Sequence, residues 1–352
     1  SIFNGETIFK DVRLTPNDLI GEDGAGRDIA FKILTVGRLT ISAICAGAMK
    51  QTLHTARWWG SERIQFDAPL YKHELMGKRI VDIAAKSMVL DGIARWCSNM
   101  IDLEQDIRIE SAASKIIGTE ILWDSLIDLF MLRGGRGYEN YYSLESRGEV
   151  PVGLERNIRD SIINLIFEGA NPVMRLLIAR EGMAEYVARG MKFANGAALI
   201  EKAVIGLWLG KHYLKGLSPI DWVTRRFSNH LNFMAAETRQ LAKDIVRISA
   251  HYQTKLEKKQ VVLAQFAERA MTLFQMSIAL AQAEANKDQP LVHELTDYFC
   301  EQKREQLCPK SFNYWAIHGS HRWIYKIATR IVSGEAVWLE DGIVPTDLPK
   351  AF

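Results

Sequence analysis

The chain has 352 residues, of which 48% are hydrophobic and 24% are charged. This composition is typical of a globular protein that buries a large core, and it excludes an extended disordered chain. The 44 basic and 42 acidic residues leave a formal net charge of +2. Because so small a charge offers no general attraction for a polyanion, we expect no nucleic-acid partner.

The chain opens with a segment of strand character. The stretch "ETIFKDVRL" alternates polar and apolar residues, and "GEDGAG" at 21–26 is typical of a turn. A lone strand leaves its edge N–H and C=O groups unpaired, so it needs a partner strand from elsewhere. We therefore interpret residues 1–27 as the end of a β-domain that a missing N-terminal half or a separate partner chain completes.

From about Asp28 the apolar residues recur at spacings of three and four, the period of an amphipathic helix. The same period returns in three later segments. Four helices joined by short connections predict an antiparallel bundle, which we assign to residues 28–190. The predicted helices span 28–59, 71–100, 106–132 and 154–167.

The chain stays helical beyond a soft boundary near 190–195. Residues 242–285 have the pattern of one or two amphipathic helices, and further helices are expected after Pro290 and after His318. The predicted fold class is therefore all-α. A long antiparallel bundle is followed by a second helical domain at 191–352, with a short strand remnant at the N-terminus.

The cysteines and histidines lack the spacing of metal ligands. His318 and His321, in "HGSHRW", have no third ligand nearby, so we expect them to be structural and predict no metal site. No CxxC pair occurs, and we interpret the cysteines as reduced, mostly buried thiols of an intracellular protein. They are Cys45, Cys97, Cys300 and Cys308.

The sequence predicts no membrane-spanning segment and no secretory signal at Ser1. The longest apolar run, at 203–210, is much shorter than the roughly 20 residues that cross a bilayer. The wider segment 193–216 places lysines beside Leu207 and Trp208. Such a helix can lie on a membrane surface or pack its apolar stripe inside a bundle, and the frequency of bundle helices favours packing.

Glu168 is the first candidate for chemistry. It follows the apolar run of "NLIFEGANPVMRLLIAR" and directly precedes Gly169. One interpretation is a helix end, with the glycine as the stop and the carboxylate in solvent. The other is a general base whose proton affinity is raised by burial. From this stretch alone the helix end is favoured.

Two further patterns suggest a site for an anionic, planar ligand. The glycines of "RGGRGY", with Arg133 and Arg136, could let backbone amides approach a phosphate, although a flexible loop between helices is the favoured explanation of the glycines alone. Arg63 and Phe66, in "SERIQFDAPL", place a cation beside an aromatic face. An arginine that merely packs beside a core phenylalanine is the alternative.

The order of these pieces resembles the C-terminal half of the acyl-CoA dehydrogenase family. The resemblance covers about Ile8 to Glu181, and the remainder is similar to the extra helical domain of very-long-chain members. The matching series is "FKDVRL", "LIGEDGAG", Arg38 in "VGRLTISAICAG", "ERIQFDAPL", "LRGGRGY", "ERNIRD" and "FEGANPVMRLLIAR".

The resemblance implies oxidation of a fatty acyl-CoA to the trans-2-enoyl-CoA. In the family a carboxylate removes the α-proton while the β-hydrogen leaves as hydride to the N5 atom of FAD. Glu168 aligns with that base, and Arg38 and Gly169 align with the substrate site. Arg63 and Phe66 correspond to FAD contacts across a subunit interface. The glycines that would approach the FAD pyrophosphate are Gly134, Gly135 and Gly137.

The resemblance also implies partners and a location. These are an acyl-CoA substrate, an electron-transfer flavoprotein, and further copies of the chain in a homodimer or tetramer. The expected location is the cytoplasm, or the mitochondrial matrix in a eukaryote, peripheral to the inner membrane if 193–216 binds lipid. Since the other half would hold the flavin ring, we expect this chain alone to be inactive.

Three departures from the family pattern keep other interpretations open. Ala170 replaces a threonine, Met131 a glutamine of the FAD site, and Asp67 a glycine. One alternative is an acyl-CoA oxidase of similar fold, which passes electrons to oxygen. Another is a non-catalytic assembly or scaffold subunit that kept the bundle and lost the flavin.

Overall fold

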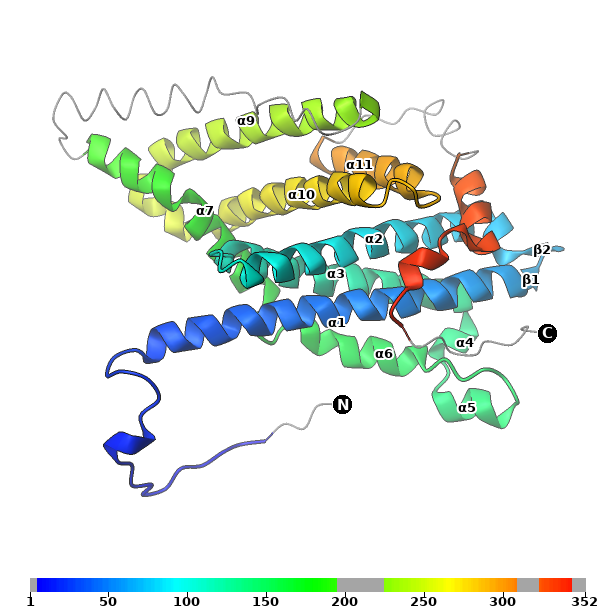
Figure 1. Ribbon diagram of the computed structural model, residues 1–352, viewed down its shortest axis with the longest axis horizontal. Coiled ribbons are helices and arrows are strands. Elements are labelled where there is room, and N and C mark those ends of the chain that lie inside the picture. The colour runs from blue at the N-terminus through cyan, green and yellow to red at the C-terminus, as the bar shows by residue number, and fades with distance from the viewer. Residues whose placement is uncertain (1–4, 195–224, 309–322, 344–352) are drawn as a thin grey trace.

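The structure is a computed structural model that describes residues 5–194, 225–308 and 323–343. Its main feature is a set of three long helices that lie side by side, α1 (Gly26–Glu62), α2 (Glu74–Asp102) and α3 (Arg108–Arg133) (Figure 1). Their bounds lie within a few residues of the predicted ones. The all-α bundle that the apolar periodicity predicts is therefore confirmed.

A short hairpin separates α1 from α2. The antiparallel strands β1 (Ile64–Gln65) and β2 (Ala68–Pro69) are joined by Phe66 and Asp67, whose φ angles are 50° and 62°. Two successive left-handed residues match the right-handed twist of a tight hairpin. The turn holds Phe66 at the end of α1, where its ring centre lies 6.0 Å from that of His73. The 3-10 turn η2 (Leu70–Lys72) then leads into α2.

The predicted fourth helix is shorter than expected. It is α-helical only as α6 (Leu154–Ser161) and narrows to the 3-10 turn η3 (Ile162–Leu165). Between α3 and α6 the chain forms two short helices, and after η3 it forms a long helix that enters the predicted boundary region. These are α4 (Gly135–Tyr138), α5 (Tyr141–Ser146) and α7 (Asn171–Ala194).

The helices after residue 225 form layers on the α2 side of the bundle (Figure 1). The segment predicted as one or two helices is two, and the break lies at Gln253, where φ is 48°. The helix expected after Pro290 is present. The elements are η4 (Arg225–Phe227), α9 (Ser228–Tyr252), η5 (Gln253–Lys258), α10 (Gln260–Ala285) and α11 (Val292–Leu307).

The last described segment returns to α1. A helix at 323–330 continues into η6 (Ile331–Glu335) and η7 (Val337–Glu340). Glu340 is only 7% exposed, and its carboxylate accepts hydrogen bonds from Arg57 Nε at 2.7 Å and Arg57 Nη2 at 2.9 Å. His54 Nδ1 lies 2.7 Å from the same carboxylate. This partly buried cluster joins the segment to the C-terminal half of α1.

The opening segment, in contrast, forms no strand in its described part. Residues 5–15 are exposed and have no regular structure, and the 3-10 turn η1 (Pro16–Asp18) follows. A strand needs a neighbour to satisfy its backbone hydrogen bonds, and the described residues offer none. The β-domain remnant expected at residues 1–27 therefore stays a prediction, which would need a partner strand from outside the described residues.

α1 also presents an unusual amount of apolar surface. It is the helix within the described ranges that is long and apolar enough to cross a membrane, with a mean hydropathy of 1.6 over its most apolar stretch, of which 28% is buried. Helices of soluble bundles pass the same test. Its packing against α2 and α3 makes it a bundle helix here, and its exposed apolar side chains include Phe31, Ile33, Val36 and Ile44.

The described cysteines are free, and three of the four are buried, as predicted. Burial raises the pKa of the Cys45 and Cys97 thiols to about 12, so both remain protonated at neutral pH.

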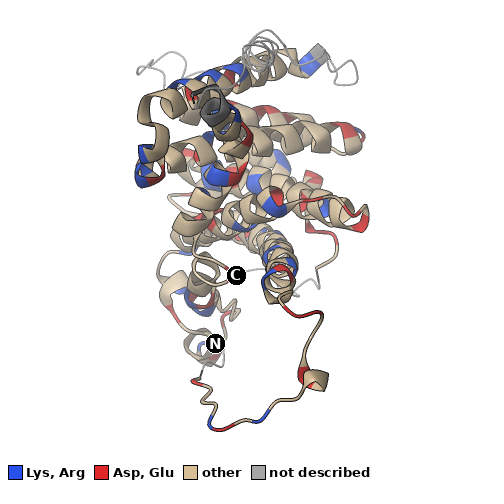
Figure 2. Ribbon diagram, turned by 90° about the vertical axis from the view of Figure 1, so that its left-hand side faces the viewer, with Lys and Arg blue, Asp and Glu red and all other residues tan. Residues whose placement is uncertain are grey.

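No group of residues suited to a metal occurs in the described part, and His318 and His321 lie outside it. Acidic and basic residues alternate along the helices (Figure 2).

A glycine on α2 lets α10 pack closely against the bundle. A Cβ atom on Gly92 would lie 2.7 Å from Ile278 Cγ2 and 2.7 Å from Gln282 Cγ. We expect Gly92→Ala to lower the thermal midpoint, because overpacking costs about 1–3 kcal/mol and outweighs the gain of about 1 kcal/mol in helix propensity.

Gly47→Ala is the matched control, since Gly47 is an exposed helical glycine of α1 with no neighbour within 4 Å of an added Cβ. The Gly47→Ala control should raise the thermal midpoint slightly. Circular dichroism melting of both variants measures the difference. An equal rise in both would contradict close packing of α10 on α2.

Candidate functional site

The turn that carries Glu168 has an unusual backbone. Glu168 and Gly169, between η3 and α7, both have positive φ angles, 56° and 102°. A left-handed conformation is costly for a residue with a side chain, so the surrounding structure must hold it. At Gly169 a Cβ atom would lie 2.6 Å from Met174 Cε. The turn therefore requires glycine at position 169 and presents the half-buried Glu168 in a fixed direction.

The Glu168 carboxylate lies against α1. A Cβ atom on Gly37 would be 2.9 Å from Glu168 Oε2, so a side chain at position 37 would displace the carboxylate. The next residue, Arg38, is 5% exposed, and its Nε donates a 3.2 Å hydrogen bond to the Glu168 carbonyl oxygen. Burial lowers the pKa of Arg38, and the Glu168 charge partly offsets that shift.

A second buried cation, Lys115 of α3, holds the other side of the turn. Its Nζ donates to the Gly169 carbonyl oxygen at 2.9 Å and to Asn171 Oδ1 at 2.7 Å, and the residue is fully buried. Burial lowers the pKa of this ammonium group to about 8. Asn171 in turn donates to Thr119 Oγ1 at 3.1 Å. The first residue of α7 is thus joined to α3.

This arrangement can support a general base. Both cations bind main-chain or amide oxygens, and no group in the described ranges donates a hydrogen bond to the Glu168 carboxylate. The carboxylate is therefore held in place without forming an ion pair. A group that must accept a proton requires such an arrangement. Sequence reasoning missed Gly37 and Lys115. The signal for Lys115 was a lone lysine within the apolar face of "SAASKIIG".

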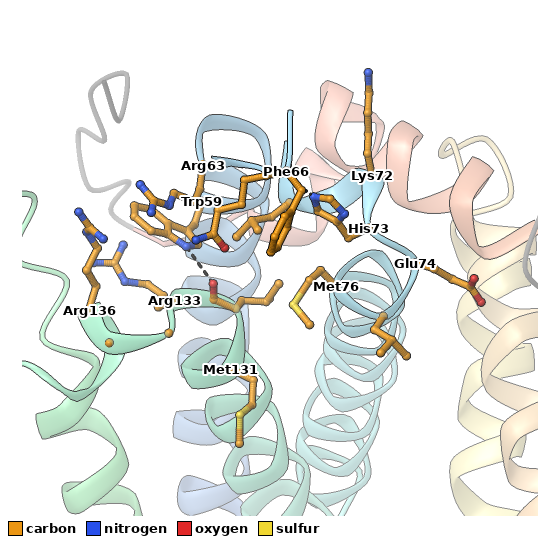
Figure 3. Close-up of a pocket in the computed structure, with 16 residues that line it drawn as sticks. Trp59, Arg63, Phe66, Lys72, His73, Glu74, Met76, Met131, Arg133 and Arg136 are labelled. Carbon is orange, nitrogen blue, oxygen red and sulfur yellow. Dashed lines mark hydrogen bonds between the residues drawn. The ribbon is translucent and has the colours of Figure 1, made fainter. Parts of the chain in front are cut away.

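The other predicted residues meet at a different place. Arg63, Phe66, Gly134 and Gly135 line one pocket of about 720 Å³ where α1 ends, between the hairpin and the start of α4 (Figure 3). Phe66 is 89% exposed. Gly134 has a φ of 59° and caps α3, which turns the chain sharply at the pocket wall. Gly137 is not part of this lining. It is buried, and a Cβ there would lie 3.1 Å from Phe130 Cδ2.

The pocket is rich in cations and aromatic rings. Figure 3 shows Arg63, Arg133 and Arg136 gathered around Trp59. The guanidinium carbon of Arg133 lies 4.4 Å from the Trp59 ring centre, and that of Arg136 lies 5.6 Å from it. Lys72 and His73 line the opposite side. These residues can attract an anion and stack on a planar group.

The residues of this pocket fit an anionic dinucleotide. Arg133 is 3% exposed, yet its Nε and Nη1 atoms are buried without a hydrogen-bond partner in the described chain. Met131, in contrast, lines the pocket and offers no donor. A buried guanidinium with unpaired donors beside an open cavity is the arrangement that a phosphate or pyrophosphate oxygen would satisfy.

The two places are far apart within one chain. Arg38 and Arg63 stand 25 positions apart along α1, which corresponds to about 37 Å at the helical rise of about 1.5 Å per residue. One dinucleotide cannot reach from the pocket to Glu168 over that length. The structure therefore brings together Arg38, Glu168 and Gly169 at one site and the predicted cofactor residues, Gly137 excepted, at another.

Comparison with known proteins identifies the class of the chain. Residues 24–183 match the family described as acyl-CoA dehydrogenase, C-terminal domain. The chain is 35% identical over 360 residues to the probable acyl-CoA dehydrogenase FadE10 of Mycobacterium tuberculosis, which covers 97% of this chain and 55% of that protein. The chain thus belongs to the acyl-CoA dehydrogenase family, as the motif series predicts.

Two further proteins show how far the likeness extends. The very long-chain specific acyl-CoA dehydrogenase, mitochondrial, of Macaca fascicularis is 27% identical over 287 residues, 79% of this chain and 42% of that one. The crystal structure of an acyl-CoA dehydrogenase complexed with FAD from Bacillus anthracis has a TM-score of 0.69 at 19% identity, covering 93% of this chain and 60% of that one. The chain spans about half the length of the curated relatives it matches.

Proposed function

We propose that this chain is the C-terminal part of an FAD-dependent enzyme that dehydrogenates a long-chain fatty acyl-CoA to the trans-2-enoyl-CoA. The observation that carries the proposal is the Glu168 carboxylate, which is half-buried, free of hydrogen-bond donors in the described chain, and seated against Gly37. Membership of the acyl-CoA dehydrogenase family supplies the reaction class.

Glu168 would act as the base that removes the α-proton. The apolar neighbour Phe167 packs against the core and would limit water at the carboxylate, which would strengthen its electrostatic interactions with the substrate. The main-chain N–H of Glu168 makes no hydrogen bond within the described ranges, so it could donate to the thioester carbonyl and stabilise the negative charge that develops there. Arg38 and Gly169 would shape the same end of the substrate site.

FAD, when bound, would accept the β-hydrogen as hydride. In this chain Arg63, Phe66, Gly134 and Gly135 would hold its anionic and planar parts, and Gly137 would support them by letting α4 pack closely on α3. Because the pocket is about 37 Å from the base along α1, each pocket would serve the flavin of a neighbouring copy. A homodimer or tetramer would account for this separation.

The remaining assignments rest on the same proposal. Residues 28–190 would form the catalytic bundle and 191–352 the extra helical domain of very-long-chain relatives, with 1–27 completing a β-domain outside this chain. An electron-transfer flavoprotein would take the electrons. The segment 193–216, proposed for peripheral membrane contact, lies almost wholly outside the described residues.

The test uses the whole-length protein that contains this chain. Purified protein should show flavin absorbance, and anaerobic addition of palmitoyl-CoA should bleach it. Oxygen consumption with peroxide release would instead indicate an oxidase. A protein without flavin absorbance, even after incubation with FAD, would contradict the proposal and favour a scaffold that has lost the cofactor.

A further inference from the structure

A second cleft lies between the bundle and the helices that follow residue 225. Its walls come from α2, α3, α10 and α11, which pack next to one another (Figure 1). Its volume is about 320 Å³, at the lower end of the range of about 300–1,000 Å³ that small-molecule sites occupy. The apolar residues of its lining are buried, and they include Ile116, Ile117, Ile121, Met271 and Phe299. A hydrocarbon chain would therefore find an apolar surface in this cleft.

Lys303 of α11 lines the cleft without a carboxylate partner among the described residues. Its side chain is half-buried, and its Nζ donates a 3.3 Å hydrogen bond to Gln306 Oε1. The same nitrogen lies 5.4 Å from the centre of the Phe299 ring. The amine is thus held beside the apolar lining by weak contacts, and no ion pair has to be broken before it can react.

The surroundings of Lys303 favour its uncharged form. Burial first and the nearby Lys86 second lower the pKa of the Lys303 amine to about 8. Carboxylates near the cleft oppose this shift only in part, and they are Glu268, Asp124 and Glu120. Near pH 8 about half of the Lys303 side chains are therefore free amines, the form that attacks a carbonyl carbon.

A buried polar group of the cleft also lacks a partner. Gln275 of α10 is 6% exposed, and its Oε1 atom accepts no hydrogen bond from the part of the chain that the structure describes. Its Nε2 donates to the Met271 carbonyl oxygen at 3.3 Å. A buried acceptor is rarely left unpaired in a packed core. The cleft therefore suits an occupant that combines an apolar chain with an N–H donor.

We propose that Lys303 is an acylation site, at which its amine takes the acyl group of an acyl-CoA and the cleft holds the acyl chain. The Lys303 nitrogen forms a bond to the thioester carbonyl carbon, and the carbon–sulfur bond breaks. The CoA thiolate leaves and takes up the proton that the nitrogen loses. The product is a neutral amide with an N–H donor and an apolar chain, and it removes the repulsion between Lys303 and Lys86.

This inference goes beyond the proposed dehydrogenation and rests on it only for the identity of the acyl donor. The test is anaerobic incubation of the whole-length protein with octanoyl-CoA, followed by peptide mass spectrometry. Without an electron acceptor, dehydrogenation stops after one turnover. We expect octanoylation of Lys303 to be at least about 10-fold faster than that of Lys287, because the cleft supplies both a free amine and a surface for the chain. Lys287 is the matched reference, since it is an exposed lysine just after α10.

A second acyl donor tests the role of the cleft itself. With acetyl-CoA the ratio of Lys303 to Lys287 labelling should fall by about 10-fold, because an acetyl group buries little apolar surface. A ratio that does not depend on chain length would show that the cleft holds no acyl chain and would refute the proposal. Labelling of Lys303 no faster than that of Lys287 would refute it as well.

Lys303→Arg confirms the assignment of the modified residue. Arginine keeps the positive charge but does not lose its proton at this pH, so the octanoyl group should be absent from that peptide while Lys287 is labelled as before. Circular dichroism melting checks that the variant folds, and Lys303→Gln replaces it if it does not. Octanoylated Lys303 in a protein whose flavin is not bleached would contradict the proposed function and leave this site standing, whereas bleaching without octanoylation would do the reverse.

Discussion

Replacing Glu168 with glutamine in the whole-length protein should slow flavin bleaching by acyl-CoA by roughly 10²–10⁴-fold, the usual contribution of a positioned general base. Glutamine keeps the shape of the side chain, so it should still fit against Gly37. It cannot accept the α-proton. Stopped-flow absorbance at the flavin band under anaerobic conditions measures the rate of bleaching directly.

FAD content separates a chemical effect from a structural one. The Glu168 turn and the cofactor pocket lie about 37 Å apart along α1, so Glu168→Gln should retain its flavin. Glu185→Gln is the control, since Glu185 is an exposed residue of α7 that pairs with Arg189 at 2.7 Å. Unchanged bleaching in Glu168→Gln would remove this carboxylate from the mechanism. Loss of flavin from the same variant would instead show that the two places are coupled.

The helices could be predicted from the sequence because their apolar period is local. The patterns ending near Trp59, Met100 and Leu132 gave helix ends that differ from the structure by three residues or fewer. The prediction was wrong about the end of the helix that begins at Leu154, because the α-helix ends at Ser161 and continues as a 3-10 turn. Periodicity does not report this change, because the turn at Glu168 is fixed by contacts with α1 and α3.

The site was predicted only in part for the same reason. Glu168, Arg63 and Gly134 stand in recognisable motifs, whereas Lys115 gains its role from residues more than 50 positions away in the chain. The sequence could mark Arg133 as a candidate because it stands beside the glycines. Its unpaired donors depend on the packing of Trp59 and Arg136 around it, which only the structure shows. The order of the motifs along the chain also could not show that the two sites lie far apart within one chain.

Lys115→Met should reduce the rate of flavin bleaching by about 10²-fold while the protein stays folded and keeps its FAD. A displacement of about 1 Å at a reacting group can cost this much, and Lys115 holds the turn through Gly169 and Asn171. The thermal midpoint should also fall, because the variant leaves two acceptors without a donor, at a cost of about 1–3 kcal/mol each before the relief of removing a buried charge. Lys78→Met is the control, since Lys78 is 41% exposed and pairs with Asp82.

The pH dependence of stability provides a second measure of the Lys115 environment. Burial lowers the pKa of Lys115 from 10.5 to about 8 in the folded protein, so between these values the unfolded chain binds a proton that the folded chain does not. The free energy of unfolding must then rise with pH in this window, by at most about 1.4 kcal/mol per pH unit for one group. Lys115→Met lacks this titration, so the stability of the unchanged protein relative to the variant should increase from pH 8 toward 10.5. Urea denaturation at several pH values measures it, and a difference that stays constant with pH would show that the lysine titrates normally and that its burial does not govern the turn.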